Sequence, residues 1–355
     1  MPPEEQFKSG ALPDTRSEEE KLKDFKFKEV VATANPVAWS VKTPDQFRKF
    51  PIYNQNGSGS CVAQSMAKEM GIMRWLKDGV YVHFSAADLY QQRSNKPTPG
   101  MIAVDAHDIA RKNGVTLEIL SPSQNMTDLQ MDSLAVAAYK KQVGSVFKIS
   151  NYVELPLMDI ETVASVIQTT NKGVMVWFYF KYDEWTDYPT IKHANLNIDA
   201  TGTLRHSVTA VDFAIVNGKK SIIIEDSWGP NFGLSGQRVI SEDFFKKRNF
   251  YAAYLTQFKF DDPITPIVPK PNHTFTKVMK FGDTSDDVRF LQDTLRFLGH
   301  YPINAASTGY YGAITSKAVL EFQKKYQVAS VPELEALAGR TFGQTSLQKI
   351  NALLM

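Results

Sequence analysis

The chain has 355 residues, of which 43% are hydrophobic and 22% are charged, and its formal net charge is only +2. This composition is typical of a soluble globular protein and gives no support for nucleic-acid binding. No apolar stretch is long enough to cross a bilayer, so we expect no membrane insertion.

Residues 1–35 form a mixed-charge segment before the first candidate domain. Ser17 and Glu20 have the spacing of a capping box, which predicts a short helix. The run from Phe25 to Lys28 alternates between aromatic and basic residues, as an extended segment does. The segment lacks the basic start and hydrophobic centre of a secretory signal peptide. From these residues alone, it is interpreted as a flexible arm.

Cys61 is the single cysteine of the chain, and the Gly/Ser-rich turn NQNGSGS precedes it directly. Apolar residues then recur at steps of three or four, which predicts an amphipathic helix beginning at or beside the thiol; these are Val62, Met66, Met70, Met73 and Leu76. The unpaired N–H groups and the dipole at a helix start stabilise a thiolate. Cys61 is therefore a candidate nucleophile, and the alternative is a buried cysteine that acts as a small hydrophobic residue.

Two further segments have readable patterns. Between Phe84 and Ser121, the sequence predicts a helix, a polar loop and a second helix that ends at Gly114. Residues 173–180 (GVMVWFYF) form a continuous apolar run, which predicts a buried strand.

A predicted hairpin carries the second part of the candidate site. Two strand-like runs flank the turn dipeptide Asn217-Gly218, with His206 at the start of the first run and Asp226 at the end of the second. Antiparallel pairing brings these two side chains together. An acidic group beside His206 would fix its tautomer and favour the imidazolium that pairs with a thiolate. The other histidines lack such a frame; they are His83, His107, His193, His273 and His300.

These blocks resemble the papain-like cysteine peptidases. Gln55 lies six positions before Cys61, as in the family's nucleophile motif, and His206 lies 145 positions after it, an interval typical of papain-type enzymes. The segment HSVTAV that starts at His206 resembles the family's histidine strand. Asp226-Ser227-Trp228-Gly229 resembles its Asn-Ser-Trp-Gly segment.

The resemblance implies an α+β, two-lobed fold over residues 36–261, with a helical left lobe and an antiparallel β-barrel right lobe. It implies that Cys61 is the nucleophile, that His206 is the acid–base and that Asp226 orients His206. Gln55 and the backbone N–H of Cys61 would form the oxyanion hole. We expect no metal and no cofactor.

Supporting roles are also implied by the resemblance. Trp228, next to Ser227, would cover the bond between the histidine and its acidic partner. Gly100 would offer its backbone to an extended substrate, although a simple turn before a helix is the alternative. Arg205 would favour acidic substrate side chains, or is an exposed arginine without a substrate role. Residues 1–35 would then be a short inhibitory propeptide, although they do not match the family's longer propeptide motif.

Three positions depart from the family pattern. Asp226 replaces the usual asparagine, and its charge should raise the pKa of His206. Ser58 stands where many relatives have a disulfide cysteine, and Val62 replaces the tryptophan that usually follows the nucleophile. None of these changes removes a catalytic atom, so we expect an active enzyme, with a structural cysteine or a decayed enzyme as the alternative.

The prolines of residues 262–275 predict an extended, semi-rigid linker. Residues 276–355 then predict a small all-α three-helix bundle, in which Ser285 caps the first helix. The apolar residues of the three helices are Val288, Leu291, Leu295 and Leu298, then Ala318, Val319, Phe322 and Tyr326, then Leu347, Ile350, Leu353 and Leu354.

The C-terminal segment resembles the common peptidoglycan-binding module. The likeness rests on the order Gly282-Asp283, Asp287-Val288, Leu291-Gln292, Leu298-Gly299, Gly309-Tyr310-Tyr311-Gly312, Ala318-Val319 and Phe322-Gln323. It implies peptidoglycan as a partner of residues 276–355. Because these are chiefly core and turn residues, a helical appendage that serves protein contacts is the alternative.

Together these expectations describe a monomeric cysteine endopeptidase that acts on peptides or proteins and is tethered to bacterial cell wall, with a bacterial or bacteriophage source. It would be made in the cytoplasm and act at the wall, or be associated with a virion. The alternative function is a wall-binding or virion structural protein whose peptidase fold is inactive or cuts only itself.

Overall fold

The computed structural model describes residues 10–23, 25–26, 36–134, 144–186, 190–191, 204–259, 270–302, 305 and 307–354. Residues 262–269 of the predicted linker and residues 1–9 and 27–35 of the predicted arm lie outside this described part. The chain divides into two compact units, Met1–Phe260 and Asp261–Met355, which are considered separately.

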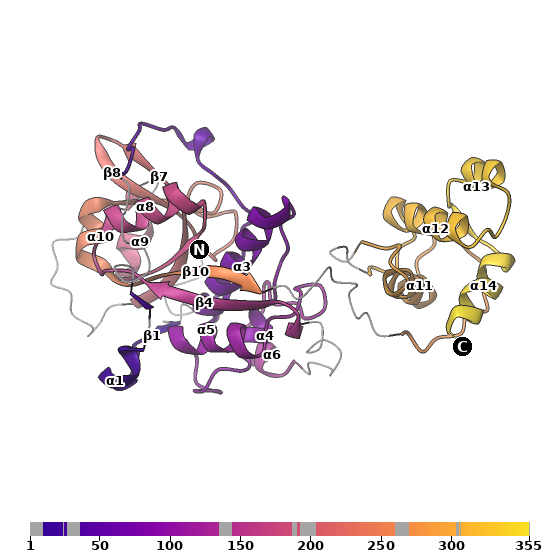
Figure 1. Cartoon of the computed structure of the whole chain (residues 1–355), viewed down its shortest axis with the longest axis horizontal. Helices are drawn as coiled ribbons and strands as arrows, with labels where there is room; N and C mark the ends of the chain where they lie inside the picture. The colour runs from indigo at the N-terminus through magenta and orange to yellow at the C-terminus, as the bar shows by residue number, and fades with distance from the viewer. Residues whose placement is uncertain are drawn as a thin grey trace. The chain divides into compact units, whose positions relative to one another are not determined.

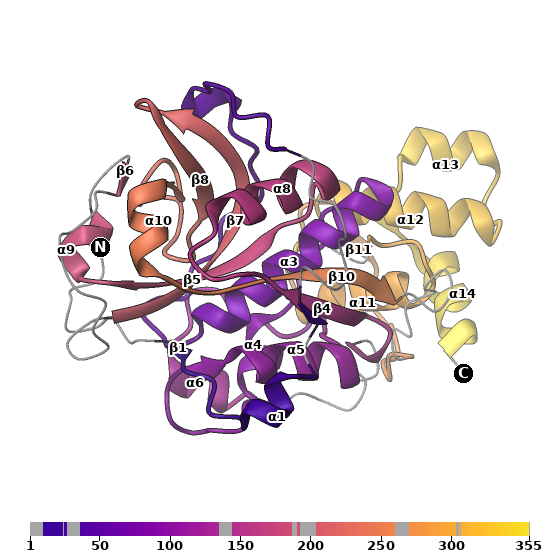
Figure 2. The same ribbon diagram turned by 60° about the vertical axis from the view of Figure 1, so that its left-hand side comes forward.

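The first unit has a helical lobe built around one long helix. The helices of this lobe are α1 (Glu18–Lys21), α3 (Cys61–Asp78), α4 (Ala86–Tyr90), α5 (Ala103–Lys112) and α6 (Asp128–Asp132), and a short 3₁₀ turn covers Pro44–Gln46. Figures 1 and 2 show α4, α5 and α6 grouped together on one side of the sheet strands. Helix α3 contacts α4 and α5 as well as strands β7 (Leu204–Val216) and β10 (Asn249–Lys259), so it joins the two lobes.

The helix predicted at the cysteine is confirmed. It begins at Cys61 and ends at Asp78, after which Gly79 takes a left-handed conformation with φ of 75°. An amphipathic helix was predicted, but residues 61–73 are all buried, with contacts to both the helical lobe and the sheet. Lys68 is tolerated there because its Nζ lies 2.5 Å from Oε2 of Glu225.

The other lobe is an eight-stranded sheet in the order β2-β4-β10-β5-β7-β8-β9-β6. Its remaining strands are β2 (Phe25–Lys26), β4 (Lys148–Glu154), β5 (Val174–Phe180), β6 (Thr190–Ile191), β8 (Lys219–Glu225) and β9 (Gln237–Ser241). The pairs β2–β4 and β6–β9 are parallel, and the other neighbouring pairs are antiparallel. The predicted buried strand is confirmed as β5, and the predicted α+β class is confirmed by the two lobes together.

Helices α8 (Ile160–Thr170) and α10 (Glu242–Arg248) pack against this sheet, and α9 (Tyr182–Thr186) follows β5. Their apolar side chains join those of the strands in one core, which includes Val163, Phe178, Ile222 and Phe244. Burial of such side chains contributes roughly 1.5–3 kcal/mol each before conformational entropy is subtracted. This core fixes the strands that carry the candidate site.

The predicted hairpin is confirmed as β7 and β8. Asn217 and Gly218 have φ of 50° and 74°, so both lie in the left-handed region that a tight two-residue turn requires. The register pairs Thr209 with Glu225, which brings Asp226, the next residue, alongside the start of β7. On its other side β7 pairs with β5, where Phe178 lies opposite His206.

The second unit is helical, as predicted, with one addition. The three expected helices are α11 (Asp286–Phe297), α12 (Ala313–Lys325) and α14 (Gln344–Leu354), and Ser285 caps the first by accepting from the N–H of Val288. A further short helix, α13 (Val331–Leu337), was not predicted, and strands β11 (Met279–Lys280) and β12 (Thr341–Phe342) pair with each other. The core contains Leu291, Leu295, Val319, Phe322 and Ile350.

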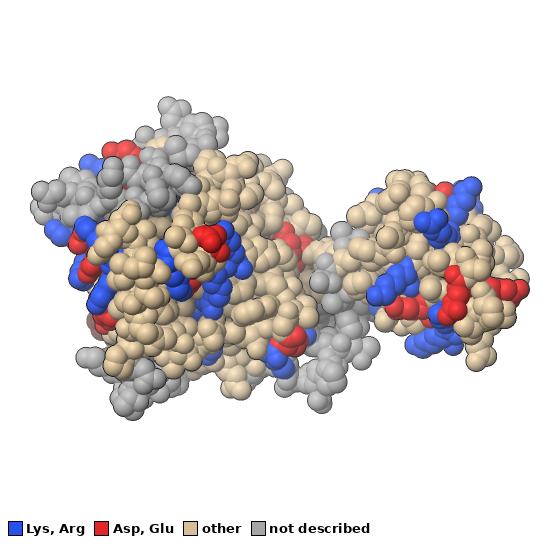
Figure 3. All heavy atoms as spheres, turned by 90° about the horizontal axis from the view of Figure 1, so that it is seen from above, with Lys and Arg blue, Asp and Glu red and all other residues tan. Residues whose placement is uncertain are grey.

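Charged side chains of both signs are interspersed on the face of the molecule seen in Figure 3. This mixture agrees with the net charge of +2. Among the helices that the structure describes, none combines the length and apolar character needed to cross a membrane.

Candidate active site

Cys61 is the first residue of α3 and is completely buried. The first intrahelical bond runs from the N–H of Gln64 to the carbonyl of Ser60, at 2.9 Å. The N–H of Cys61 therefore has no acceptor within the helix, as is general for the first turn. A donor and a thiol thus lie on one residue, at the positive end of the helix dipole.

Gln55 is held rigidly beside this helix start. Its backbone N–H donates to the carbonyl of Ser227 at 2.8 Å, and its Oε1 accepts from Oγ of Ser227 at 2.5 Å. Its Nε2 donates to the carbonyl of Ser58 at 2.5 Å, which occupies one of the two N–H bonds of the amide. The Gln55 side chain is buried, and its orientation is set by the segment that follows Asp226.

Ser58 closes the turn before the nucleophile by hydrogen bonds. Its Oγ donates to the carbonyl of Gln55 at 2.6 Å and lies 2.8 Å from Oγ of Ser60. Ser58, which stands where many relatives have a disulfide cysteine, therefore stabilises this turn by local hydrogen bonds and not by a covalent link to a distant loop.

His206 and Asp226 form a buried pair, with 2.7 Å between Nε2 of the imidazole and Oδ1 of the carboxylate. Because Nε2 faces the carboxylate, Nδ1 is the nitrogen left for Cys61, with whose side chain His206 also interacts. Two tryptophan rings, Trp185 and Trp228, have centroids 5.6 Å from that of the imidazole. Trp228 thus lies near the imidazole, and Trp185, which was not predicted, lies equally near.

The electrostatics of the pair favour charge on both partners. Burial disfavours the imidazolium, but the Asp226 carboxylate and the Cys61 side chain outweigh it and raise the pKa of His206 to about 9. Burial also opposes ionisation of Asp226, yet His206 and the Arg238 guanidinium hold the pKa of that carboxyl far below its usual range. The raised pKa of His206 agrees with the sequence-based expectation for an aspartate at this position.

Arg238 and Trp185 were missed by sequence reasoning. Oδ2 of Asp226 accepts from Nε of Arg238 at 2.7 Å and from Nε1 of Trp185 at 2.9 Å. Nη1 of Arg238 donates to the carbonyl of Trp185 at 2.6 Å. The one available signal was an arginine next to Val239 and Ile240, and the structure shows that all five residues of β9 are buried.

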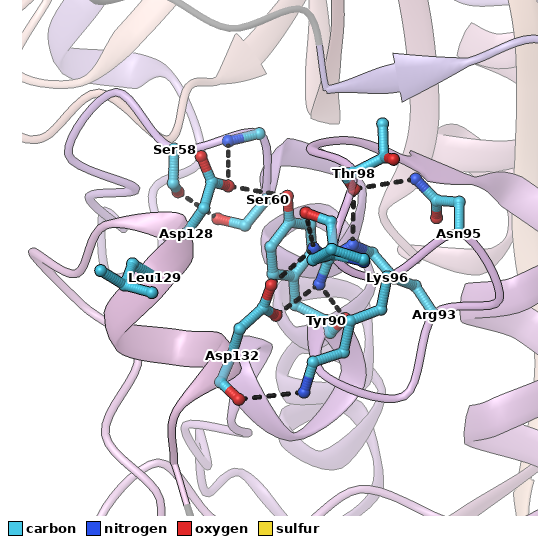
Figure 4. Close-up of polar contacts among 12 residues, drawn as sticks. Ser58, Ser60, Tyr90, Arg93, Asn95, Lys96, Thr98, Asp128, Leu129 and Asp132 are labelled. Carbon is cyan, nitrogen blue, oxygen red and sulfur yellow. Dashed lines mark hydrogen bonds and ion pairs between the residues drawn. The ribbon is translucent and has the colours of Figure 1, made fainter.

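A polar network beside the turn that precedes Cys61 was also missed, and Figure 4 shows its Tyr90 and Asp128 side chains. Oδ1 of Asp128 accepts from the N–H of Gly59 at 2.9 Å and from the hydroxyl of Tyr90 at 2.7 Å. The same hydroxyl accepts from the N–H of Gly100 at 2.9 Å. We call Gly59, Asp128, Tyr90 and Gly100 the relay, because these bonds link the turn before Cys61 to the loop that carries Gly100.

The loop on the far side of the relay has its own anchors, visible in Figure 4. Arg93 forms two bonds to the carboxylate of Asp132, at 2.7 and 2.9 Å, and its Nε donates to the carbonyl of Thr98. Asn95 donates to the carbonyl of Gly100 at 3.0 Å. Residues 93–100 are therefore held from several sides, and Gly100 takes a φ of 95° that favours glycine.

The N-terminal arm passes over this surface. Strand β1 (Ala11–Leu12) pairs in parallel with β3 (Met101–Ile102), and the N–H of Met101 donates to the carbonyl of Gly10 at 2.8 Å. A methyl group added to Gly10 would lie 2.5 Å from Sγ of Cys61 and 2.4 Å from the carbonyl oxygen of Gly59. Gly10 thus lies directly against the thiol, where only a glycine fits.

The remaining predicted site residues are placed as follows. Gly100 lies beside the arm, because a Cβ added to it would meet the Leu12 side chain at 2.9 Å. Arg205 lies on β7 opposite Tyr179 and is partly buried rather than exposed. Among the described residues, no group of three or more His, Cys, Asp and Glu side chains is arranged to hold a metal ion.

Two regions of the chain match known families. Residues 21–249 match the family described as papain family cysteine protease, and this region covers more than half of the chain. Residues 284–330 match the family described as putative peptidoglycan binding domain.

Curated relatives include the senescence-specific cysteine protease SAG12 of Arabidopsis thaliana, which is 24% identical over 64% of this chain and 63% of its own length. The oryzain beta chain of Oryza sativa subsp. japonica is 27% identical over 52% of this chain and 38% of its own length. The chain therefore spans less than two thirds of each of these relatives.

Solved structures with a similar fold include xylellain, a cysteine protease from Xylella fastidiosa, with a TM-score of 0.55, 18% identity, and coverage of 71% of this chain and 97% of that chain. Digestive procathepsin L2 proteinase from Tenebrio molitor larval midgut has a TM-score of 0.56, 19% identity, and coverage of 71% and 78%. At these identities the likeness concerns the fold.

Proposed function

Because the chain belongs to the papain family of cysteine proteases and carries a second domain of the peptidoglycan-binding type, we propose that it hydrolyses peptide bonds through Cys61, His206 and Asp226. The observation that supports this most strongly is the buried His206–Asp226 pair beside a thiol at the start of α3. The raised pKa of His206 favours transfer of the thiol proton to the imidazole, which leaves an imidazolium–thiolate pair.

The chemistry then follows in two steps. The thiolate of Cys61 attacks the scissile carbonyl, and the negative charge on the oxygen is stabilised by the N–H of Cys61 and by the second N–H of the Gln55 amide. The imidazolium of His206 gives its proton to the leaving amine, and an acyl thioester remains on Cys61. Neutral His206 then removes a proton from water, which attacks the thioester and releases the carboxylic acid and the thiol.

We further propose that the described form is a zymogen in which residues 10–12 fill the substrate site. The full burial of Cys61 and His206 and the contact of Gly10 with Sγ support this role for the arm. Pairing of β1 with β3 gives the arm the extended backbone contact that an unfolded substrate needs. Catalysis would therefore begin when this segment is displaced or cut.

The second unit is proposed to hold the protease on bacterial cell wall. The support is the match of residues 284–330 to a family described by that binding activity, so peptidoglycan is the expected ligand and stem peptides or wall proteins are the expected substrates. A tether of this kind raises the local substrate concentration without any contact between the two units. A bacterial or bacteriophage source fits this use.

The test is an incubation of wild type and Cys61→Ala with a mixed peptide library, followed by identification of new amino termini. A parallel incubation with purified sacculi measures the fraction of each protein that pellets, with a chain lacking residues 270–355 as the control. Cutting by wild type alone, and pelleting that requires the second unit, are the expected results. Equal library spectra for wild type and Cys61→Ala, after the arm has been cut by an added protease, would favour a structural protein with a peptidase fold.

A further inference from the structure

The acidic partner of His206 is a full negative charge in a buried place. The Asp226 side chain is only 1% exposed, so its charge cannot be screened by water. The papain-like pattern has a neutral asparagine at this position, which needs no counter-charge. The imidazolium of His206 is shared between this carboxylate and the Cys61 side chain, so a second cation is needed to balance the carboxylate.

Arg238 meets that need from strand β9. Its side chain is 3% exposed, and its Nε donates to Oδ2 of Asp226 at 2.7 Å. The guanidinium lies against the rings of Trp185 and Trp228, at 5.5 and 5.4 Å from their centroids, and Nη1 is bound to the Trp185 carbonyl. A planar group that contacts two rings and is hydrogen-bonded at two nitrogens is restricted in orientation.

The two oxygens of Asp226 have separate partners. Oδ1 faces Nε2 of His206 and accepts from the N–H of Ser227 at 2.7 Å, whereas Oδ2 faces Arg238 and Trp185. Arg238 therefore binds the carboxylate from the side away from the imidazole. It can fix the rotation of the carboxylate and offset its charge without competing for the oxygen that His206 uses.

We propose that Arg238 is a positioning residue that makes an aspartate usable here, because Asp226 and Arg238 together offer His206 a fixed acceptor with nearly the net charge of a neutral amide. The proposal assigns a role to Arg238 beyond the proposed triad, and it rests on the proposed function only in naming His206 as the acid–base. The guanidinium acts through Asp226 and touches no reacting atom.

Other charged groups also act on the pair. Cys61 and Asp226 act on His206 directly. Asp226 also interacts electrostatically with Lys68 of α3, which forms an ion pair with Glu225. Loss of Arg238 therefore removes the cation bound to the carboxylate while the more distant Lys68–Glu225 pair remains.

The experiment is a histidine NMR titration of the full-length chain with isotopically labelled histidine, in which His206→Ala identifies the signal of His206. Arg238→Gln should shift the pKa of His206 upward by about one unit, because the unbalanced carboxylate holds the imidazole proton more tightly. Arg238→Lys keeps the charge and should leave the titration close to wild type. Asp226→Asn should lower the pKa by about one unit or more.

A matched control is Arg248→Gln, since Arg248 is a buried arginine of the same unit that pairs with Glu184 instead. It should destabilise the protein without moving the titration of His206. If Arg238→Gln leaves the pKa unchanged or lowers it, Arg238 has only a structural role and the proposal is wrong.

A second measurement covers variants that fold poorly. Asp226→Asn leaves Arg238 buried without its carboxylate, so the double variant Asp226→Asn/Arg238→Gln should have a higher midpoint of urea unfolding than Asp226→Asn alone. A double variant that is less stable than Asp226→Asn contradicts the proposal. Neither readout needs turnover, so failure of peptide hydrolysis in wild type would count against the proposed function and leave the role of Arg238 to be judged on its own.

Discussion

Charge at the level of single residues decides how the candidate site behaves with pH. The pKa of His206 is raised to about 9 in the folded chain, against about 6.5 for an ordinary histidine. A group with a raised folded pKa stabilises the fold fully below its ordinary pKa, and this contribution is lost as the pH rises through the folded value. The relevant window therefore runs from about pH 6.5 to about pH 9.

This window gives a prediction for stability. The quantity of interest is the free energy of unfolding of wild type minus that of His206→Gln. This difference should be larger at pH 6 than at pH 10, by up to roughly 3 kcal/mol. Urea unfolding of both proteins across this range measures the gap. A gap that widens as the pH rises would show that His206 is buried in its neutral form and would contradict the charged pair.

Gln55 gives a second prediction at this scale. Gln55→Ala removes one of the two proposed oxyanion donors and should lower kcat about 10²- to 10³-fold with little change in KM. Steady-state kinetics with a peptide that wild type cuts in the library incubation measures both constants. A matched control is Gln168→Ala, because Gln168 also bonds backbone groups, at Ala38 and Pro36, but lies outside the site. A rise in KM with unchanged kcat in Gln55→Ala would indicate a binding role instead.

Some of the site residues could be identified from the sequence, and others could not. Cys61, His206 and Asp226 stood out because a single thiol preceded a helical pattern and a turn dipeptide joined two strands. Arg238 did not, because its function depends on a contact with Asp226 that only the pairing of β8 with β9 creates. The negative charge of Asp226, at a position that is usually asparagine, indicated that a positively charged partner should be sought.

The arm is an element whose effect one methyl group can test. Gly10→Ala places a methyl 2.5 Å from Sγ of Cys61, so residues 10–12 should leave the site. The rate of Cys61 alkylation by iodoacetamide in the full-length chain should rise by about tenfold or more, if the contact loses about 1.4 kcal/mol. Gly343→Ala is the control, because an added methyl there meets nothing closer than 4.0 Å. Equal alkylation rates in wild type and Gly10→Ala would refute occlusion by the arm.

The relay gives a second prediction for a structural element. Tyr90→Phe keeps the ring and its contact with the Arg93 guanidinium at 3.8 Å but removes the hydroxyl bonded by Asp128 and Gly100. The buried N–H of Gly100 loses its acceptor, so the free energy of unfolding should fall by about 1–3 kcal/mol.

Urea unfolding tests this value. Tyr179→Phe is the control, because the structure gives the Tyr179 hydroxyl no hydrogen bond to a described residue and its ring is also in contact, stacked on Phe250. If the two variants lose equal stability, the relay does not fix the loop at Gly100.

Elements were predicted best where a local pattern was strong. The helix at Cys61, the hairpin and the buried strand β5 each follow from periodicity or turn residues that need no tertiary contact. The burial of residues 61–73 of α3 could not be read in the same way, because Lys68 and Glu69 suggest a solvated face until the partner of Lys68, Glu225, is known. Helix α13 was missed although Ser330 and Glu333 form a capping box with a proline in the first turn.

On the scale of the whole molecule, the chain joins a papain-family unit to a unit of the peptidoglycan-binding type. The α+β class and both family resemblances could be recognised from motifs, because the order and spacing of these motifs match those of the two families. The relay could not, since Tyr90 and Asp128 are 38 positions apart and carry no motif of their own. The approach of Gly10 to Cys61 likewise depends on the folded path of the arm.

The central claim is that Cys61 attacks the substrate carbonyl and carries the acyl group. The most direct measurement is mass spectrometry of the protein quenched in acid during turnover of a cleaved peptide or its ester. The account predicts a thioester adduct on the proteolytic fragment that contains Cys61, and no adduct and no turnover in Cys61→Ala. Turnover that persists in Cys61→Ala, or an adduct on another residue, would contradict it.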